Sequence, residues 1–186
     1  MTHAGTEILE TGRLLLRPFR LEDAEAMYRN WASDKDVTKY LTWPVHASPE
    51  ASAEVLAGWV EQYADKSFYT WAIVLKELGE PVGSISVVSR SDAVEKAEIG
   101  YCIGKKWWRQ GITSEALAQV IAYLFETVGL NRVESRHDPR NPNSGAVMRK
   151  CGMTYEGTMR KSDRNNQGIC DACHYAILRE EFSLKR

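Results

Sequence analysis

The residues best suited to chemistry lie where a predicted strand leads into a predicted helix. Residues 97–103 are typical of a strand, and the loop at residues 109–114 reads Arg-Gln-Gly-Ile-Thr-Ser before a helical stripe of apolar residues. A loop that enters a helix exposes unpaired backbone N–H groups at the positive end of the helix dipole, where a phosphate or pyrophosphate binds well. Gly111 permits the close approach of such a group, and Arg109 and Thr113 can add a charge and a hydroxyl. An ordinary helix start explains the same spacing equally well.

A second pattern of reactive residue types, Cys-Asp-Ala-Cys-His at residues 170–174, matches the motif of c-type haem attachment and half of many zinc sites. Residues 169–178 are predicted to form a strand, on which residues three apart point to opposite faces. Two thiols on opposite faces cannot share a metal ion, and Cys102 and Cys151 stand alone in the sequence. We therefore expect no metal, no haem and four free thiols.

Composition and charge limit the classes of function. The 186 residues are 44% apolar and 26% charged, and 24 Lys and Arg residues face 25 Asp and Glu residues for a formal charge of -1. At roughly 100–200 residues per domain, this length predicts one domain with its own core. The balanced charge supplies no global positive field that would hold nucleic acid. The longest apolar run is far shorter than the ~18–20 residues of a membrane span, and no export signal opens the chain, so we expect a cytoplasmic protein.

The spacing of apolar residues predicts an alternating α/β scaffold for these candidate residues. Helical periodicity indicates helices at residues 21–32, 49–63, 117–125 and 144–151. Short extended runs indicate strands at residues 13–18, 68–75, 81–88, 97–103, 132–137, 153–161 and 169–178. The first of these strands is expected at an edge of the sheet, because a proline closes it. The elements belong in one compact sheet with helices on its faces.

Six short motifs along the chain occur in an order and at a spacing that match those of a known protein family. They are Thr11–Pro18, Glu22-Asp23-Ala24, Ala97–Tyr101, Glu115-Ala116-Leu117, Asn141 with Ser144, and Lys150–Met153 followed by Glu156-Gly157. Together with the loop at residues 109–114, they resemble the GNAT N-acetyltransferases, and within them the branch that includes the ribosomal-protein acetyltransferases RimJ and RimL. Each motif alone is weak, but together they cover nearly the whole chain.

The resemblance implies a fold and a cosubstrate. The expected GNAT fold is a mixed, mostly antiparallel sheet, splayed at its centre and flanked by helices, in one domain at residues 11–182 with tails at residues 1–10 and 183–186. Acetyl-CoA is expected to enter between the strands at residues 97–103 and 132–137. The residues implied in its binding are Tyr101, Cys102, Ile103, Trp108, Arg109, Gln110, Gly111, Ile112, Thr113, Ser114, Asn141 and Ser144.

Some positions depart from the family's pattern. The pyrophosphate loop of the family begins with Gln or Arg and ends with a small residue, whereas this chain has Trp108 at the first position and Thr113 at the last. Many GNAT enzymes use a Tyr to protonate the departing thiolate, and Met148 fills that position here. A thioether cannot donate a proton. RimL-like proteins are similar to one another in placing a Ser at the position of Ser144, so the resemblance makes Ser144 the candidate acid.

Transfer to an amine also requires a base, and two carboxylates are candidates. Free amines have pKa values of about 7.7–8 at a chain terminus and about 10.4 on lysine, so most are protonated at neutral pH. Glu98 lies on the strand beside the expected pantetheine channel, and Asp163 falls where a RimL-like enzyme places its basic carboxylate. A salt-bridged strand residue is the alternative for Glu98, and a turn residue is the alternative for Asp163. We expect Glu98 to carry more of the reaction, because a strand holds it more rigidly than a turn holds Asp163.

The sequence thus predicts an acetyl-CoA-dependent N-acetyltransferase with Glu98, Ser144 and Asp163 as candidate catalytic residues. The acceptor is a primary amine, either a protein N-terminus or a small molecule. A catalytically silent acyl-CoA-binding protein is the alternative that Met148 and the altered loop favour. No nucleic-acid or membrane partner is expected, and both a monomer and a homodimer remain open. About two aromatic residues of the first half are expected to line the acceptor site, from the set Trp31, Tyr40, Trp43, Trp59 and Trp71.

Overall fold

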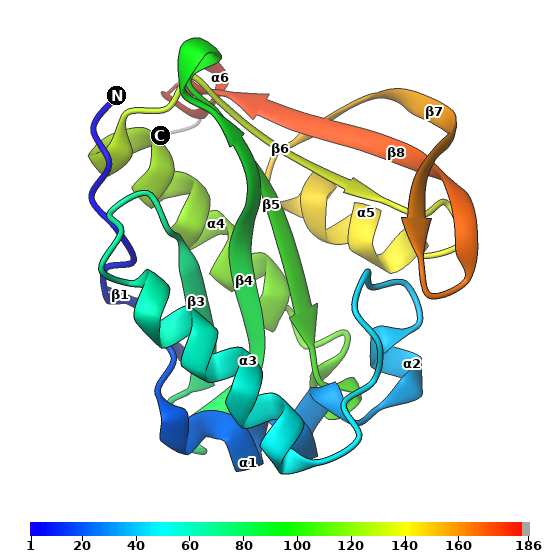
Figure 1. The fold of residues 1–186 in the computed structure, drawn as a ribbon. Helices are drawn as coiled ribbons and strands as arrows, with labels where there is room; N and C mark the ends of the chain where they lie inside the picture. Colours follow the sequence, from blue (N-terminus) through cyan, green and yellow to red (C-terminus); the bar gives the residue numbers. More distant parts are fainter. Residues whose placement is uncertain (184–186) are drawn as a thin grey trace.

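Eight strands form one sheet in the computed structural model, which describes residues 1–183 (Figure 1). The strands are β1 (Leu9–Glu10), β2 (Leu14–Arg17), β3 (Thr70–Leu75), β4 (Glu80–Ser91), β5 (Lys96–Ile103), β6 (Arg132–His137), β7 (Thr154–Asn165) and β8 (Gly168–Leu178). Their order across the sheet is β1-β2-β3-β4-β5-β6-β8-β7. Strands β5 and β6 are parallel, and the other described pairs are antiparallel. The mixed, mostly antiparallel sheet implied by the resemblance is confirmed.

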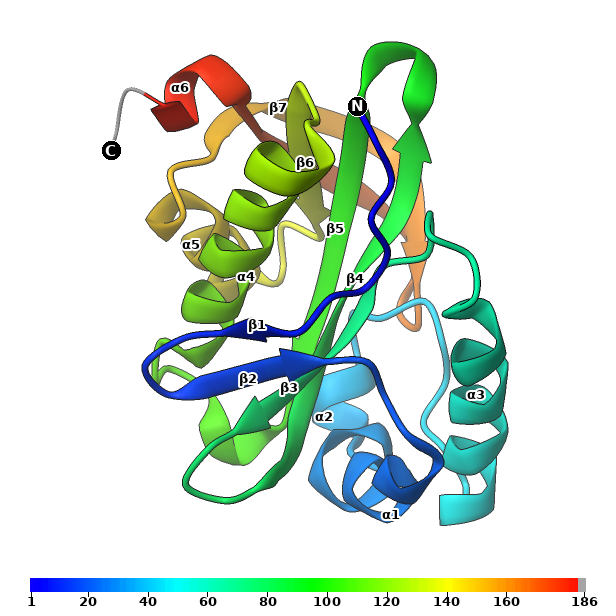
Figure 2. The same ribbon diagram turned by 90° about the vertical axis from the view of Figure 1, so that its left-hand side faces the viewer.

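Helices cover both faces of this sheet. They are α1 (Ala24–Met27), α2 (Lys35–Thr38), α3 (Pro49–Gln62), α4 (Ile112–Tyr123), α5 (Pro142–Lys150) and α6 (Arg179–Ser183). Figure 2 shows α1, α2 and α3 on one side of β4 and β5, with α4 and α5 on the other side. In the described part of the chain, no helix has the length and apolar character needed to cross a membrane.

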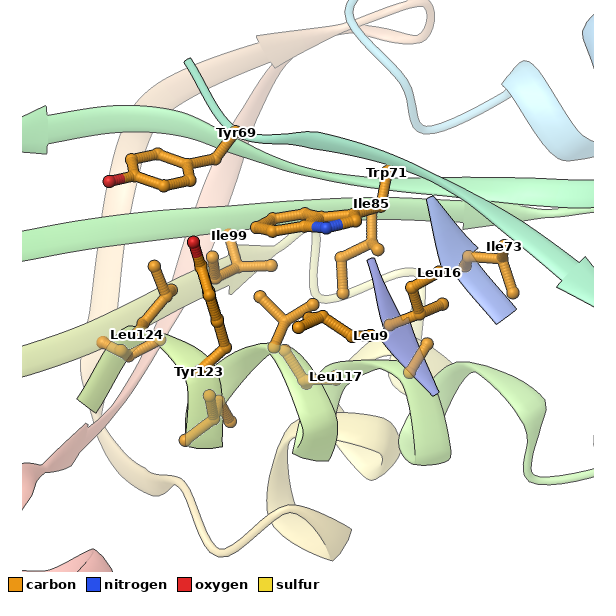
Figure 3. Packing of buried hydrophobic residues seen from close by; sticks show 14 of the residues in the cluster. Leu9, Leu16, Tyr69, Trp71, Ile73, Ile85, Ile99, Leu117, Tyr123 and Leu124 are labelled. Atoms are coloured by element: carbon orange, nitrogen blue, oxygen red, sulfur yellow. The ribbon is translucent and has the colours of Figure 1, made fainter. Parts of the chain in front are cut away.

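Two apolar clusters hold the helices against the sheet. The larger one lies between the sheet and α4, where the rings of Trp71 and Tyr123 meet edge to face with centroids 5.8 Å apart (Figure 3). The smaller one lies under α1 and α3 and includes Trp31 and Leu56. Trp31 and Trp71 are fully buried, so these two aromatic residues stabilise the core and do not line a site.

The sheet splays between β5 and β6. Residues Lys96–Glu98 of β5 pair with Arg132–Glu134 of β6, and the described pairing stops there. Beyond this point β5 stays with β4 as far as Ile103, whereas β6 stays with β8 as far as His137. Because the two strands keep different partners, their ends diverge, as Figure 1 shows. The gap thus lies between the same two strands where the resemblance implied that it would be.

Three short features differ from the sequence-based expectations. Residues 1–10, expected to be a tail, contribute to the fold: Leu9 of β1 is buried, and the Thr2 N–H donates to the Val128 carbonyl. Strand β1 therefore takes the sheet edge that was expected for β2. Helices α2 and α6 span only four and five residues, too few to show a helical period in the sequence. Of the expected tail at residues 183–186, residues 184–186 lie outside the described part.

Candidate active site

A cavity of about 550 Å³ opens where β5 and β6 separate. The end of β5, the loop before α4, the start of α5 and the segment around α2 all contribute to its wall. All the residues predicted to bind acetyl-CoA line it except Gln110, whose side chain donates instead to the Lys106 carbonyl at 2.9 Å. The structure therefore brings together residues that the sequence places about 40 positions apart, and their role in binding stays a prediction.

The start of α4 presents free backbone donors to this cavity. Gly111 precedes the helix with φ 76° and ψ 3°, and no side chain caps the helix start. Arg109 also has a positive φ, of 61°. Because the first N–H groups of a helix have no intrahelical partner, those of Ile112, Thr113 and Ser114 are available to an anion. Backbone N–H groups that converge in a turn before a helix form the kind of concave site that holds phosphate.

Cations surround this helix start. The Lys150 Nζ and the Arg13 Nη2 lie 3.5 and 3.6 Å from the position that a Cβ on Gly111 would occupy. Arg13 is held by Glu115 at 2.6 Å, whereas Lys150 lines the cavity from the last turn of α5. Lys150 belongs to one of the six sequence motifs, but it was not among the residues predicted to bind the cosubstrate. Its ammonium adds a positive charge beside the backbone donors of the loop.

Ser144 and Tyr101 form a hydroxyl pair on the opposite wall. The Tyr101 hydroxyl donates to the Ser144 carbonyl at 2.9 Å and lies 3.1 Å from the Ser144 Oγ. Burial raises the pKa of Tyr101. The close approach of α5 to β6 depends on Gly145, where an added Cβ would lie 2.4 Å from the His137 Nε2. Met148 is fully buried and does not line the cavity, so this helix offers Ser144 as its hydroxyl donor.

Replacing Ser144 by Ala is expected to lower kcat by about 10²–10⁴-fold, the usual contribution of a positioned proton donor. The dissociation constant of acetyl-CoA should stay within about twofold, because thiolate charge develops only as the reaction proceeds. Steady-state kinetics with one confirmed amine and calorimetric titration with acetyl-CoA measure the two quantities. Tyr101→Phe, which removes the hydroxyl that contacts both the carbonyl and the Oγ of Ser144 but leaves Ser144 in place, should give a smaller loss. Parent-like turnover in Ser144→Ala would make Ser144 a helix-start residue.

The two candidate bases lie outside the cavity wall and share one cation. Glu98 of β5 and Asp163 of β7 both form ion pairs with Arg136 of β6. Burial is the largest influence on Glu98 and raises its pKa. The pKa of Asp163 is lowered: burial opposes this, and the hydrogen bond from Arg136 and the backbone N–H of Arg164 outweigh it. Asp163 is therefore the weaker base of the two.

The structure corrects the reason for ranking these carboxylates. Asp163 was expected in a mobile turn, but it lies within β7, opposite Cys170 of β8. A bulge between Met159 and Asp163 interrupts the pairing and lets β7 continue to Asn165. Both carboxylates are thus held by the sheet, and rigidity does not separate them. The raised pKa of Glu98 is then the property that favours it as the candidate base.

The turn between β7 and β8 holds in place the segment that starts at α2 and forms one wall of the cavity. The Asn166 backbone N–H donates to the Leu41 carbonyl at 3.0 Å, and its side-chain amide donates to the carbonyls of Thr38 and Trp43 at 2.8 and 2.7 Å. Tyr40, in the middle of this segment, lines the cavity and lies beneath the Arg140 guanidinium. Of the aromatic residues expected near an acceptor, Tyr40 is the one in the cavity wall.

The Cys-Asp-Ala-Cys-His segment lies on β8, as expected from the sequence. Cys170 is opposite Asp163 and Cys173 is opposite Thr158 in the pairing with β7. All four cysteines are free thiols. Among residues 1–183, no group of three or more His, Cys, Asp or Glu side chains is arranged to hold a metal ion.

Comparison with known proteins identifies the family. The model of the acetyltransferase (GNAT) domain matches residues 13–154, well over half of the chain. The chain belongs to the GNAT acetyltransferase family. The expectation from the sequence motifs is thus confirmed, and with it the expectation of an acetyltransferase enzyme.

Relatives of this GNAT acetyltransferase match it over most of its length. The N-acetyltransferase p20 of Bacillus licheniformis is 28% identical, covering 95% of this chain and 99% of that protein. YoaA of Bacillus subtilis is 31% identical, with coverage of 92% and 97%. The ribosomal-protein-serine acetyltransferase of Escherichia coli is 26% identical over 74% of this chain and 76% of its own. A crystal structure of a GNAT acetyltransferase from Bacillus anthracis superposes with a TM-score of 0.82 at 29% identity, covering 94% and 99% of the two chains.

Proposed function

We propose that this GNAT protein transfers the acetyl group of acetyl-CoA to a primary amine by direct attack. The cavity at the splay carries the proposal, because it places an uncapped helix start on one side and the Ser144–Tyr101 hydroxyl pair on another. The first suits a pyrophosphate, and the second suits a leaving thiolate. Both line the same cavity.

The residues present fit acetyl-CoA. The backbone N–H groups of Ile112–Ser114 and the ammonium of Lys150 would hold the pyrophosphate. In the described part of the chain, β5 has no strand partner on this edge beyond Glu98, and the Ile99 carbonyl accepts from the Ser135 hydroxyl. The peptide groups after Ile99 would be available to the amides of the pantetheine arm. Acetyl-CoA supplies the activated acetyl group as a thioester.

Proton transfer is assigned to residues of strand β5 and helix α5. Glu98 accepts the proton of the acceptor ammonium, directly or through a water molecule, so that the nitrogen lone pair becomes nucleophilic. As the new C–N bond forms and the C–S bond breaks, the Ser144 hydroxyl beside Tyr101 gives its proton to the sulfur, and the nitrogen, which releases its second proton as the amide forms, restores the serine hydroxyl directly or through water. The products are the N-acetylated amine and CoA, and the proton taken by Glu98 returns to solvent.

The acceptor that we propose is the N-terminal amine of a protein. The support is the relative named ribosomal-protein-serine acetyltransferase, together with the RimJ/RimL-like motifs of this chain. An N-terminal amine also has the lower pKa of the two protein amines, at about 7.7–8, which makes it the easier one to deprotonate. The cytoplasmic location stays a prediction, and so does the oligomeric state, which is either a monomer or a homodimer.

An acceptor screen tests this function. Purified protein and acetyl-CoA are incubated with peptides that carry a free N-terminus, with the same peptides blocked at the N-terminus but retaining a lysine, and with amino sugars, polyamines and amino acids. We expect CoA release with the free-N-terminus peptides and none with their blocked counterparts. Release with small amines alone would instead assign a small-molecule acceptor. Acetyl-CoA binding without release to any amine would indicate a silent binding protein.

A further inference from the structure

The guanidinium of Arg136 joins carboxylates from two other strands. Its Nη1 donates to the Oε1 of Glu98 on β5, and its Nε donates to the Oδ2 of Asp163 on β7 at 2.7 Å. The three residues are 38 and 27 positions apart in the sequence. A planar guanidinium can hold two carboxylates at fixed angles at once, which a lysine ammonium cannot do with the same precision.

Arg136 lies where β5 and β6 separate. Glu98 and Glu134 are opposite each other in the last described pair between β5 and β6. Arg136 lies two residues further along β6, on the same face as Glu134, where β6 no longer pairs with β5. Its side chain reaches back across the point of separation. Tyr101 and Cys102, three and four residues after Glu98, already line the cavity.

Arg136 is also the cation that balances this group of charges. The charged or titratable side chains that act on Glu98 come from three strands: Arg136 and Glu134 on β6, His174 on β8 and Asp163 on β7. On β4, the register partner of Glu98 is the uncharged Ser89. Glu134 has its own cations, Lys96 at 2.7 Å and Arg132 at 2.8 Å. Glu98 and Asp163 are therefore left to share Arg136.

We propose that Arg136 is a positioning residue for acetyl transfer, which fixes the carboxylate of Glu98 at the opening between β5 and β6 and balances its charge. The inference rests on the proposed function, in which Glu98 accepts the proton of the amine. Asp163 acts as the second anchor of the guanidinium. The side chain of Glu98 is only 13% exposed, so solvent cannot replace the guanidinium as its partner.

The test is the pH dependence of kcat for Arg136→Gln and Arg136→Lys with one confirmed amine. Arg136→Gln should lower kcat by about 10–100-fold, because a displacement of about 1 Å can cost 10²-fold. It should also move the acid limb of the profile upward by about one pH unit, because loss of a nearby positive charge disfavours the carboxylate form. Arg136→Lys restores the positive charge but not the planar guanidinium that holds two carboxylates. The acid limb should therefore return to its position in the parent protein, while kcat should recover only in part. The KM for acetyl-CoA should stay within about twofold in both.

Arg132→Gln is the matched control. Arg132 lies on the same face of β6 and joins Glu134 to Glu156 of β7, so its loss removes a comparable link away from the splay. This variant should retain the parent kcat and pH midpoint. A parent-like profile in Arg136→Gln, or an equal change in Arg132→Gln, would overturn the inference while leaving the proposed function intact. A parent protein that releases no CoA with any amine would overturn both.

Discussion

Gly111→Val is expected to raise the dissociation constant of acetyl-CoA by about 100-fold or more. Hydrogen bonds to a charged group contribute roughly 1.5–3 kcal/mol each, so losing one or two of them accounts for this factor at about 1.4 kcal/mol per tenfold change. Gly111 has φ 76° immediately before α4, a conformation that a β-branched residue adopts only with strain. An added Cβ would also extend toward Lys150 and Arg13, within the space where the phosphates are expected.

Backbone strain alone must be separated from loss of the site. Gly79→Val provides the control, because Gly79 has a similar φ of 73° in the turn between β3 and β4 and does not line the cavity. Calorimetric titration with acetyl-CoA and thermal unfolding should be measured for both variants. We expect both to lose stability, but only Gly111→Val to lose affinity. An unchanged acetyl-CoA affinity in a folded Gly111→Val protein would remove this loop from the cosubstrate site.

Glu98→Gln is expected to lower kcat at neutral pH by about 10²–10⁴-fold, the range of general base catalysis. The acid limb of the pH profile should disappear with it. Because burial raises the pKa of Glu98, the parent's acid limb should lie above the ordinary glutamate value of about 4.3, with activity increasing as the carboxylate ionises. Asp163 has a lowered pKa, so a limb governed by Asp163 would lie below the ordinary aspartate value instead. The position of the limb thus identifies the base.

Two further variants complete this experiment. Glu134→Gln removes a carboxylate directly opposite Glu98 in the strand pairing, but one that Lys96 and Arg132 already neutralise. It should leave kcat close to that of the parent. Asp163→Asn should cost less than Glu98→Gln, since it removes only one anchor of Arg136. A collapsed rate in Asp163→Asn beside a normal profile in Glu98→Gln would reverse the assignment.

The loop that we propose to bind the cosubstrate lines the cavity, and its position could be predicted from the sequence because its signal is local. Gly111 and the start of α4 are neighbours in the chain, and an uncapped helix start offers backbone donors whatever the distant residues are. Gln110, which the resemblance implied in acetyl-CoA binding, does not line the cavity, because its side chain donates to the Lys106 carbonyl in the short turn before it. That direction depends on the conformation of residues 105–107, which the sequence pattern does not specify.

The acceptor side could not be predicted to the same extent. Arg136 meets its carboxylates, and Asn166 meets residues 38–43, only through the register of β6, β7 and β8. A shift of one residue in a strand would turn these side chains to the other face. The alternation in β7 is also interrupted by its bulge, so the sequence placed Asp163 in a turn. Long-range pairing, not residue type, decides this part of the site.

The most direct test of the account follows a labelled acetyl group. Protein is incubated with acetyl-CoA carrying ¹³C in the acetyl group and with a peptide that has a free N-terminus, and the products are analysed by mass spectrometry and thiol titration. The account predicts that the label reaches the N-terminal nitrogen of the peptide, with one CoA thiol released for each acetyl group transferred. Release of CoA with the label found only in free acetate would contradict acetyl transfer to an amine at this site.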